Sequence, residues 1–243
     1  MSGHSRWAGI KHKKGLIDAK KGKTFTRIVR ELTIAARAGG GSPDNNPRLR
    51  KAMDDARAAN MPSDNVKKAI QRGTGEIPGM TFEEISYEGY GPAGAAVYLT
   101  GTTDNKNRTT SEIRKMFSSH GGNMGESGCV GWMFQAKGQL VVEKAVWTDE
   151  DKLMTVALDA GAEDIKTEDP EVFQVITAPA DFDKVKKALE AAAVPLASAE
   201  VTFLPSTTVP LKDGAARQLE TLLEELENHD DVKDVYTNGD IQG

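Results

Sequence analysis

The residue types with the clearest chemistry stand in the first thirty positions, where nine Lys and Arg accompany a single acid, Asp18. Such a density of cations cannot be buried in a core, so it predicts either a solvated terminus or a surface that binds polyanions. Trp7 and the imidazoles of His4 and His12 lie among these cations and could stack on exposed bases. The residues that we expect to bind nucleic acid are Arg6, Trp7, Lys11, His12, Lys13, Lys14, Lys20, Lys21, Lys23, Arg27 and Arg30.

The rest of the sequence shows no arrangement typical of an enzyme. His120 stands at a predicted helix end, where we expect it to cap the helix, and His229 stands in an acidic turn. Neither histidine has a serine elbow or a zinc-binding spacing beside it. The single cysteine, Cys129, leaves no internal disulfide and no cysteine metal cluster, and we expect it to be a small buried hydrophobe. We therefore expect no catalytic residue, no metal ion, no cofactor and no small-molecule substrate.

Two glycine-rich stretches resemble phosphate-binding loops only in part. Residues 89–94 formally match GxGxxG, but they join two predicted strands rather than a strand and a helix. We interpret them as a hairpin turn. Residues 121–128 lack the Lys-Ser/Thr pair of a P-loop and predict a long turn with several positive φ angles, for which a binding role stays open.

The charge is divided unevenly along the chain. Residues 1–75 carry 17 Lys and Arg against 6 Asp and Glu, a net +11, whereas residues 76–243 carry 14 against 30, a net −16. This division predicts a basic head that binds nucleic acid, joined to an acidic body. The alternative is that the uneven charge has no such partner and that the basic tail is merely solubilising.

Membrane and secreted classes do not fit the composition. No apolar run approaches the roughly 18 residues of a membrane-spanning helix, and no signal-peptide core follows the basic start. The basic arm also lacks the amphipathic helix that a membrane-surface role requires. One cysteine in 243 residues suits a reducing compartment, so we expect a cytoplasmic protein with no membrane partner.

Helical periodicity predicts a small helical domain after the arm. Residues 1–15 have no apolar period and are expected to be extended or disordered. Apolar residues at i, i+3, i+4 and i+7 then indicate three successive helices. The predicted boundary signals are Thr24 and residues 39–41 for the first helix, Asn46-Pro47 and Asn60 for the second, and Pro62 and Gly73 for the third.

From Thr81 the pattern changes to alternating strands and helices. Residues 139–204 read strand, helix, strand, strand, helix, strand, which is the ferredoxin-like order. Residues 130–134 and 139–142 are predicted as two strands, separated by Lys137-Gly138. The block before this order lacks a closing helix and strand, which residues 213–236 supply.

We therefore predict an α+β fold in which an N-terminal helical bundle domain is followed by two ferredoxin-like α/β domains, one inserted into the other. The predicted domains are residues 1–78 for the arm and helical domain, residues 79–135 with 205–243 for a discontinuous α/β domain, and residues 136–204 for the inserted ferredoxin-like domain. The alternative is a simple linear division of the chain.

Several motifs resemble the YebC family. They are Ser2-Gly3-His4-Ser5-Arg6-Trp7, Ile10-Lys11-His12-Lys13-Lys14, Asp18-Ala19-Lys20, Ala35-Ala36-Arg37, Asn60-Met61-Pro62, Tyr87-Glu88-Gly89-Tyr90-Gly91-Pro92, Thr103-Asp104-Asn105-Lys106-Asn107-Arg108-Thr109 and Gly121-Gly122-Asn123-Met124-Gly125. The resemblance extends from Met1 to about Tyr236 and implies a helical domain followed by two α/β domains. It also implies a regulator of gene expression rather than an enzyme.

The resemblance leaves two targets open. Members are commonly described as transcriptional regulators that bind DNA, whereas some resemble ribosome-associated translation factors that relieve stalling, and mitochondrial relatives activate translation of a cytochrome oxidase subunit. The predicted helices lack an obvious base-reading set at one helix N-terminus. An acidic body would be repelled by bare phosphate but could contact basic ribosomal proteins. We therefore expect rRNA or tRNA on the ribosome as the partner, with DNA as the alternative.

Overall fold

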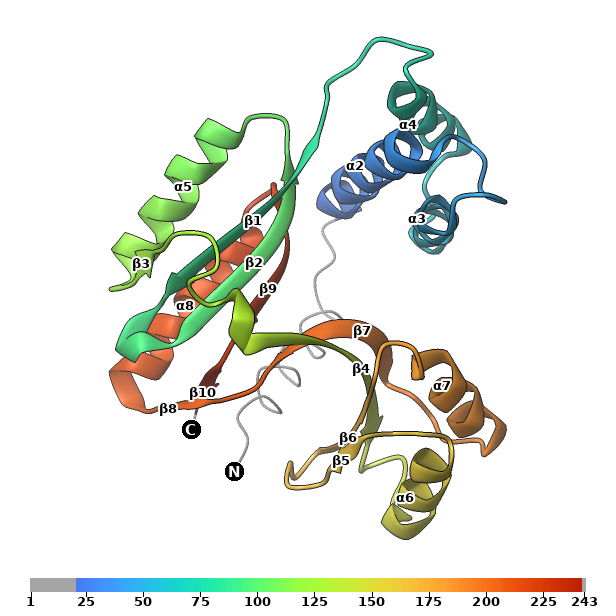
Figure 1. Ribbon diagram of the computed structural model, residues 1–243, viewed down its shortest axis with the longest axis vertical. Helices are drawn as coiled ribbons and strands as arrows, with labels where there is room; N and C mark the ends of the chain where they lie inside the picture. The colour runs from blue at the N-terminus through green and yellow to red at the C-terminus, as the bar shows by residue number, and fades with distance from the viewer. Residues whose placement is uncertain (1–20, 242–243) are drawn as a thin grey trace.

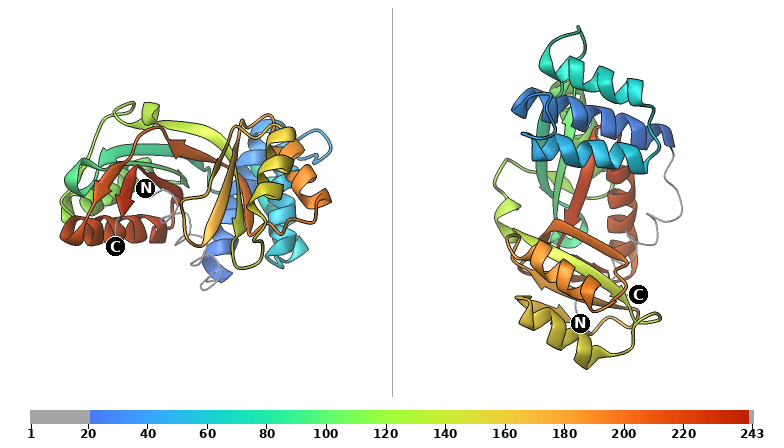
Figure 2. Two further views of the ribbon diagram at one scale, coloured as in Figure 1. Left: turned by 90° about the horizontal axis from the view of Figure 1, so that it is seen from below. Right: turned by 90° about the vertical axis from the view of Figure 1, so that its right-hand side faces the viewer.

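The computed structural model describes residues 21–241, which form three units (Figure 1). The helical unit and the second sheet lie on the same side of the first sheet, one above the other in Figure 1. The right-hand view of Figure 2 shows this side facing the viewer. The helical unit consists of α2 (Lys21–Gly39), α3 (Pro47–Ala58) and α4 (Ser63–Thr74). Its core closes around Leu32, Leu49 and Ala69, none of which is exposed.

Helix α3 begins where the sequence predicts. The side chain of Asn46 accepts a hydrogen bond from the backbone N–H of Leu49 at 3.0 Å, and Pro47 occupies the first helical position. The amide of Asn46 also donates to the carbonyl of Ala35 at 2.8 Å. The same residue therefore starts α3 and fixes it against α2, which satisfies backbone groups at two helix ends.

Two other predicted helix boundaries are wrong. Thr24 lies inside α2, which begins no later than Lys21. Helix α4 continues past Gly73 to Thr74 and is capped by Gly75, which adopts a left-handed conformation with φ of 82°. A Cβ atom on Gly73 would lie 2.7 Å from Cβ of Ala36 and would collide with a backbone carbonyl of α2. Gly73 thus allows α2 and α4 to pack closely, while Gly75 supplies the positive φ that ends the helix.

The first sheet has four antiparallel strands in the order β3-β1-β2-β9. Its elements are β1 (Glu83–Tyr90), β2 (Ala96–Thr103), α5 (Lys106–Ser119), β3 (Asn123–Met124), α8 (Asp213–Asn228) and β9 (Val232–Thr237). Phe117 of α5 and Leu219 and Leu223 of α8 are fully buried in one cluster with residues of the sheet. Both helices therefore cover the same face, and residues 89–94 form the predicted hairpin turn between β1 and β2.

The second sheet is also antiparallel and has the order β5-β6-β4-β7. Its elements are β4 (Phe134–Glu143), α6 (Glu150–Asp159), β5 (Asp164–Lys166), β6 (Val172–Thr177), α7 (Phe182–Ala191) and β7 (Ser198–Pro205). Along the chain these follow the predicted order of strand, helix, strand, strand, helix, strand. The expected α+β fold, with N-terminal helices before antiparallel sheets, is confirmed.

The chain enters the second sheet through β4 and leaves it through β7, and β9 then pairs with β2 of the first sheet. An aromatic cluster joins the two sheets, because the ring of Tyr98 in β2 lies 5.9 Å from that of Phe134 in β4 and 5.7 Å from that of Phe203 in β7. This strand order agrees with an inserted unit. The domain boundaries at residues 78, 135 and 204 remain a prediction.

Two predictions for individual strands are wrong. Residues 131–133 form a short 3-10 turn, η2 (Gly131–Met133), and β4 then runs without a break through Gly138. A Cβ atom on Gly138 would collide with Oγ1 of Thr177 and lie 2.7 Å from the ring of Phe182, so this glycine allows close packing and does not form a turn. The segment between β7 and α8 contains a further short strand, β8 (Val209–Leu211), which pairs in parallel with β10 (Gly239–Ile241).

Candidate nucleic-acid interface

Most of the predicted binding residues lie outside the described part of the chain. These are Arg6, Trp7, Lys11, His12, Lys13, Lys14 and Lys20. Lys21 and Lys23 belong to the first turn of α2, but their side chains are not described either. Their role in binding stays a prediction. Arg27 and Arg30 are the members of the set whose side-chain contacts can be followed.

Both of these arginines contact the first sheet unit. Nη1 of Arg30 lies 2.7 Å from Oδ1 of Asp231 and donates to the backbone carbonyls of Asp230 at 2.8 Å and Thr102 at 3.0 Å. Nη2 of Arg27 donates to the carbonyl of Glu227 in the last turn of α8 at 2.9 Å. The two side chains therefore hold α2 against the sheet. Their contacts give no support to a direct role in nucleic-acid binding, which remains untested.

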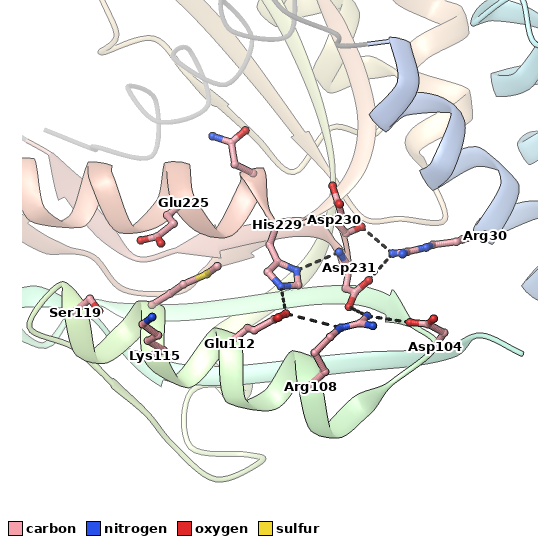
Figure 3. Close-up of a pocket in the computed structure, with 12 residues that line it drawn as sticks. Arg30, Asp104, Arg108, Glu112, Lys115, Ser119, Glu225, His229, Asp230 and Asp231 are labelled. Carbon is pink, nitrogen blue, oxygen red and sulfur yellow. Dashed lines mark hydrogen bonds and ion pairs between the residues drawn. The ribbon is translucent and has the colours of Figure 1, made fainter. Parts of the chain in front are cut away.

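Asp231 is the centre of this contact (Figure 3). Its side chain is 2% exposed, and Arg30 approaches it from α2 while Arg108 approaches from α5. Its Oδ2 accepts hydrogen bonds from Nη2 of Arg108 at 2.8 Å, Oγ1 of Thr109 at 2.6 Å and Oγ1 of Thr103 at 3.1 Å. Burial alone would raise the pKa of Asp231, but the hydrogen bonds from Thr109 and Arg108 and the charge of Arg30 outweigh it and lower the pKa to about 2.

The sequence around α5 builds this site locally. Asn105 caps α5 by accepting a hydrogen bond from the N–H of Arg108 at 3.1 Å, which places Arg108 and Thr109 in the first turn. A Cβ atom on Gly101 would collide with the carbonyl oxygen of Asp231, so this glycine lets the chain before β9 approach β2. Sequence reasoning missed Asp231, because its partners Arg30 and Arg108 are distant along the chain.

A second group of charges also holds α2 in place. Arg48 of α3 contacts Oε1 of Glu31 in α2 and Oε1 of Glu84 in β1, each at 2.6 Å. Lys233 of β9 lies 3.5 Å from Oε2 of Glu31. Burial would raise the pKa of Glu31, but Arg48 and Lys233 lower it below its ordinary value. These contacts hold α2, the helix that follows the arm in sequence, against α3 and the first sheet.

Several exposed cations of the helical unit are not engaged by the protein. They are Arg37 at the end of α2 and Lys67, Lys68 and Arg72 on α4. Within residues 21–241 none of these four side chains makes an ion pair or a hydrogen bond. The backbone nitrogen of Arg37 would lie 3.2 Å from a Cβ on Gly73, so the end of α2 lies against α4. The signal in the sequence was their position outside the apolar stripes of α2 and α4.

The cleft between α5 and α8 has a volume of about 760 Å³ and is lined by charged side chains (Figure 3). His229 lies in it, with Nε2 2.9 Å from Oε2 of Glu112 and Nδ1 accepting from the N–H of Asp231 at 3.1 Å. Both ring nitrogens are thus engaged, and neither partner among the residues that the structure describes is a hydroxyl or a thiol. His120 caps α5 as predicted, with Nδ1 2.9 Å from the carbonyl of Met116. The cleft gives no catalytic arrangement among the residues that line it.

The glycine-rich loop after α5 binds a carboxylate of the protein itself. The N–H groups of Gly128, Val130 and Gly131 donate to Glu88 at 2.8, 2.8 and 2.6 Å. Burial would raise the pKa of Glu88, but these three bonds lower it below its ordinary value. Of these three donors only Gly128 belongs to residues 121–128, and its N–H is already used by Glu88, so these contacts give no support to the binding role left open for that loop. Cys129, next to this site, is half-buried rather than fully buried.

Neither a metal site nor a membrane-spanning helix is present in the described part of the chain. Between residues 21 and 241 no three His, Cys, Asp or Glu side chains are grouped so that they could hold a metal ion. In the same part of the chain no helix has the length and the apolar character needed to cross a membrane.

This chain is similar to known proteins over nearly its whole length. Residues 5–76 match the TACO1/YebC protein N-terminal domain, and residues 82–239 match the TACO1/YebC second and third domain. A protein of Endomicrobium trichonymphae is 55% identical over 242 residues, covering 99% of this chain and 96% of its own length. One of Pelotomaculum thermopropionicum is 52% identical over 243 residues, covering 100% of both chains. Both are named "Probable transcriptional regulatory protein".

A solved structure gives the same result for the fold. The crystal structure of a conserved hypothetical protein from Aquifex aeolicus has 45% sequence identity and a TM-score of 0.81, and the match covers 98% of each chain. The two family models together, each of the two relatives and this structure all match the chain along nearly its whole length. The chain therefore belongs to the TACO1/YebC family.

Proposed function

We propose that this protein is a non-enzymatic regulator of gene expression that binds nucleic acid through its helical unit and the basic arm before it. The observation that carries the proposal is the fixed position of α2, which Arg30 and Arg48 hold in the protein by ion pairs of 2.7 and 2.6 Å. A cationic arm attached to a fixed helix can reach phosphates while the folded body sets its direction. The exposed, unengaged cations of α2 and α4 extend the same surface.

We further propose that the physiological target is structured RNA, rRNA or tRNA, on the ribosome in the cytoplasm. The support is the charge of the body, a net −16 from 14 Lys and Arg and 30 Asp and Glu in residues 76–243. Such a body is repelled by bare nucleic acid but attracted to basic proteins that lie beside RNA. A ribosome offers both surfaces, whereas an isolated DNA duplex offers only phosphate.

A DNA-binding transcriptional regulator is the second candidate. It is favoured by the name that the relatives carry and by the four residues, 59–62, that connect α3 to α4. A turn of this length joins the helices of helix-turn-helix motifs, whose second helix reads the major groove with its N-terminal residues. Asn65 and Lys68 are exposed near the start of α4, but Asp64 in the same turn would face phosphate.

Co-sedimentation with ribosomes from a lysate separates the two candidates. We expect the full chain to pellet with ribosomes after DNase treatment, and a variant lacking residues 1–15 to remain in the supernatant. If the arm makes about six phosphate contacts, the plot of log K against log salt should have a slope of about −4 for single-stranded RNA. Failure to pellet, together with a specific footprint on duplex DNA, would favour the second candidate. A flat salt dependence with both nucleic acids would overturn the arm as the binding element.

A further inference from the structure

We propose that the outer face of helix α5 is a second nucleic-acid contact, separate from the arm and the helical unit, which binds the phosphate backbone. The face consists of Asn107, Ser111, Arg114, Lys115 and Ser118, and Lys106 stands at its N-terminal end. The inference rests on the proposed nucleic-acid-binding function and adds a surface that neither the resemblance nor the arm implies.

The five residues share one side of the helix. Their positions follow i, i+4, i+7, i+8 and i+11, which is the spacing of a single helical face, and all five are exposed. The opposite side of α5 packs on the sheet, where Thr109, Ile113 and Phe117 are fully buried. Within the described residues, Arg114, Lys115 and Lys106 have neither an ion pair nor a side-chain hydrogen bond.

The charge of this helix is opposite to that of the body that carries it. Helix α5 holds 4 of the 14 Lys and Arg in residues 76–243 but only 1 of the 30 Asp and Glu. That acid, Glu112, is engaged by His229 at 2.9 Å and lines the cleft towards α8. The outer face therefore presents cations, hydroxyls and an amide, and Lys115 at its edge also lines the cleft beside Glu112.

Helix stability does not explain these cations. Lys106 is the first residue of α5, where a positive charge opposes the helix dipole. Helices α6, α7 and α8 of the body each have an acid in the first turn, whereas α5 has none. A row of unpaired cations with hydroxyl and amide groups beside them has the composition of phosphate contacts.

The size of the face fits several phosphates. From Asn107 to Ser118 the helix rises about 16 Å at 1.5 Å per residue. Successive phosphates of one strand of a duplex are about 3.4 Å apart along the axis, so the face spans roughly five of them. The hydroxyls of Ser111 and Ser118 donate to helix carbonyls at 3.0 and 2.9 Å, and a hydroxyl can rotate towards a ligand.

The structure also fixes this face relative to the helical unit. Arg108, on the cleft side of α5, contacts Asp231 at 2.8 Å, and the same carboxylate holds Arg30 of α2 at 2.7 Å. Figure 3 shows both arginines converging on it from the two helices. A nucleic acid bound by the helical unit therefore meets α5 at a defined position rather than a variable one.

Neutralising the cations of α5 tests the proposal in the full-length chain. The test variant is K106Q/R114Q/K115Q, and the matched control is K184Q/K186Q/K187Q on α7, which removes the same charge from a face that also carries acids. Gln is a good helix former, so both variants should keep their circular dichroism spectra. The probe is a labelled single-stranded RNA of mixed sequence, titrated over a range of salt concentrations.

We expect the slope of log K against log salt to become shallower by about 2 in the α5 variant, because three phosphate contacts are lost. The α7 variant should keep the slope of the wild type. Equal slopes in the two variants would overturn the proposal, as would an α5 variant that keeps its RNA affinity but no longer binds an acidic ribosomal protein.

Deleting residues 1–15 in parallel separates this proposal from the function proposed above. If the arm deletion weakens RNA binding and the α5 variant does not, only the second contact is refuted. The reverse result would refute the arm and retain α5, and an effect of neither change would refute both.

Discussion

Replacing Asp231 with Asn should uncouple helix α2 from the first sheet. The carboxylate is 2% exposed and lies between Arg30 at 2.7 Å and Arg108 at 2.8 Å. Its pKa falls from an ordinary value of 3.8 to about 2 in the folded protein, which corresponds to about 2.5 kcal/mol at 1.36 kcal/mol per unit. Breaking a buried ion pair costs about 3–5 kcal/mol, but Arg108 is 43% exposed and can be hydrated, so we expect a loss of about 3 kcal/mol.

The pH dependence gives this prediction a second, independent part. Because the folded pKa lies below the unfolded one, the stabilisation by Asp231 is fully present at neutral pH and is lost as the pH falls through 3.8 towards 2. The D231N variant has no carboxylate there to protonate. Its free energy of unfolding should therefore fall less steeply between pH 4 and pH 2 than that of the wild type.

Urea unfolding at several pH values measures both parts, and limited proteolysis of residues 76–82, between α4 and β1, reports whether the helical unit has been released. The matched control is D104N, since Asp104 contacts the same Arg108 at 2.9 Å but is 28% exposed, and its loss should cost under about 1 kcal/mol. The reasoning is refuted if D231N lies within about 0.5 kcal/mol of D104N at neutral pH, or if its acid dependence equals that of the wild type.

Two further predictions concern glycine packing and the loop around Glu88. Gly73→Ala should lower the free energy of unfolding by about 1–3 kcal/mol, because the new Cβ would lie 2.7 Å from that of Ala36. The control Gly40→Ala, whose Cβ would have no atom within 4 Å, should lower it by only about 1 kcal/mol for the positive φ of Gly40. Denaturant unfolding compares the two variants, and equal losses would contradict the packing argument. Glu88→Gln should speed amide hydrogen exchange at Gly128 and Gly131, since a neutral amide accepts more weakly than the carboxylate that holds both N–H groups; unchanged exchange would show that the loop is fixed by other contacts.

Features with a local cause could be predicted from the sequence. Asn46 and Pro47 identify the start of α3 because a capping side chain and a fixed φ act within a few residues. Glycine is more ambiguous, since Gly73 and Gly75 both follow an apolar period. Only the packing of α2 against α4 shows that Gly73 allows close contact and that Gly75 ends the helix.

Features with a distant cause could not be predicted. Arg30 falls off the apolar stripe of its helix, which indicates a polar environment but does not identify the partner. That partner, Asp231, is 201 positions away along the chain. It can be identified only from the structure, in which β9, directly after Asp231, pairs with β2. The order of strands could be predicted for a different reason. The predicted elements before residue 136 lack a closing helix and strand, and the predicted elements at residues 213–236 supply both.

The contacts of α2 also reduce the number of cations in residues 1–75 that can contribute to the salt dependence of binding. The sequence gives residues 1–75 a charge of +11 from 17 Lys and Arg and 6 Asp and Glu, which would suggest a large salt dependence of binding. Yet Arg30 and Arg48 are already neutralised by carboxylates of the protein, and such cations release no counterions when nucleic acid binds. If nucleic acid binds as proposed, the salt slope should therefore report the cations of the arm, α4 and α5 rather than Arg30 and Arg48. Comparing the slopes of variants in each group then measures how many phosphate contacts each group makes.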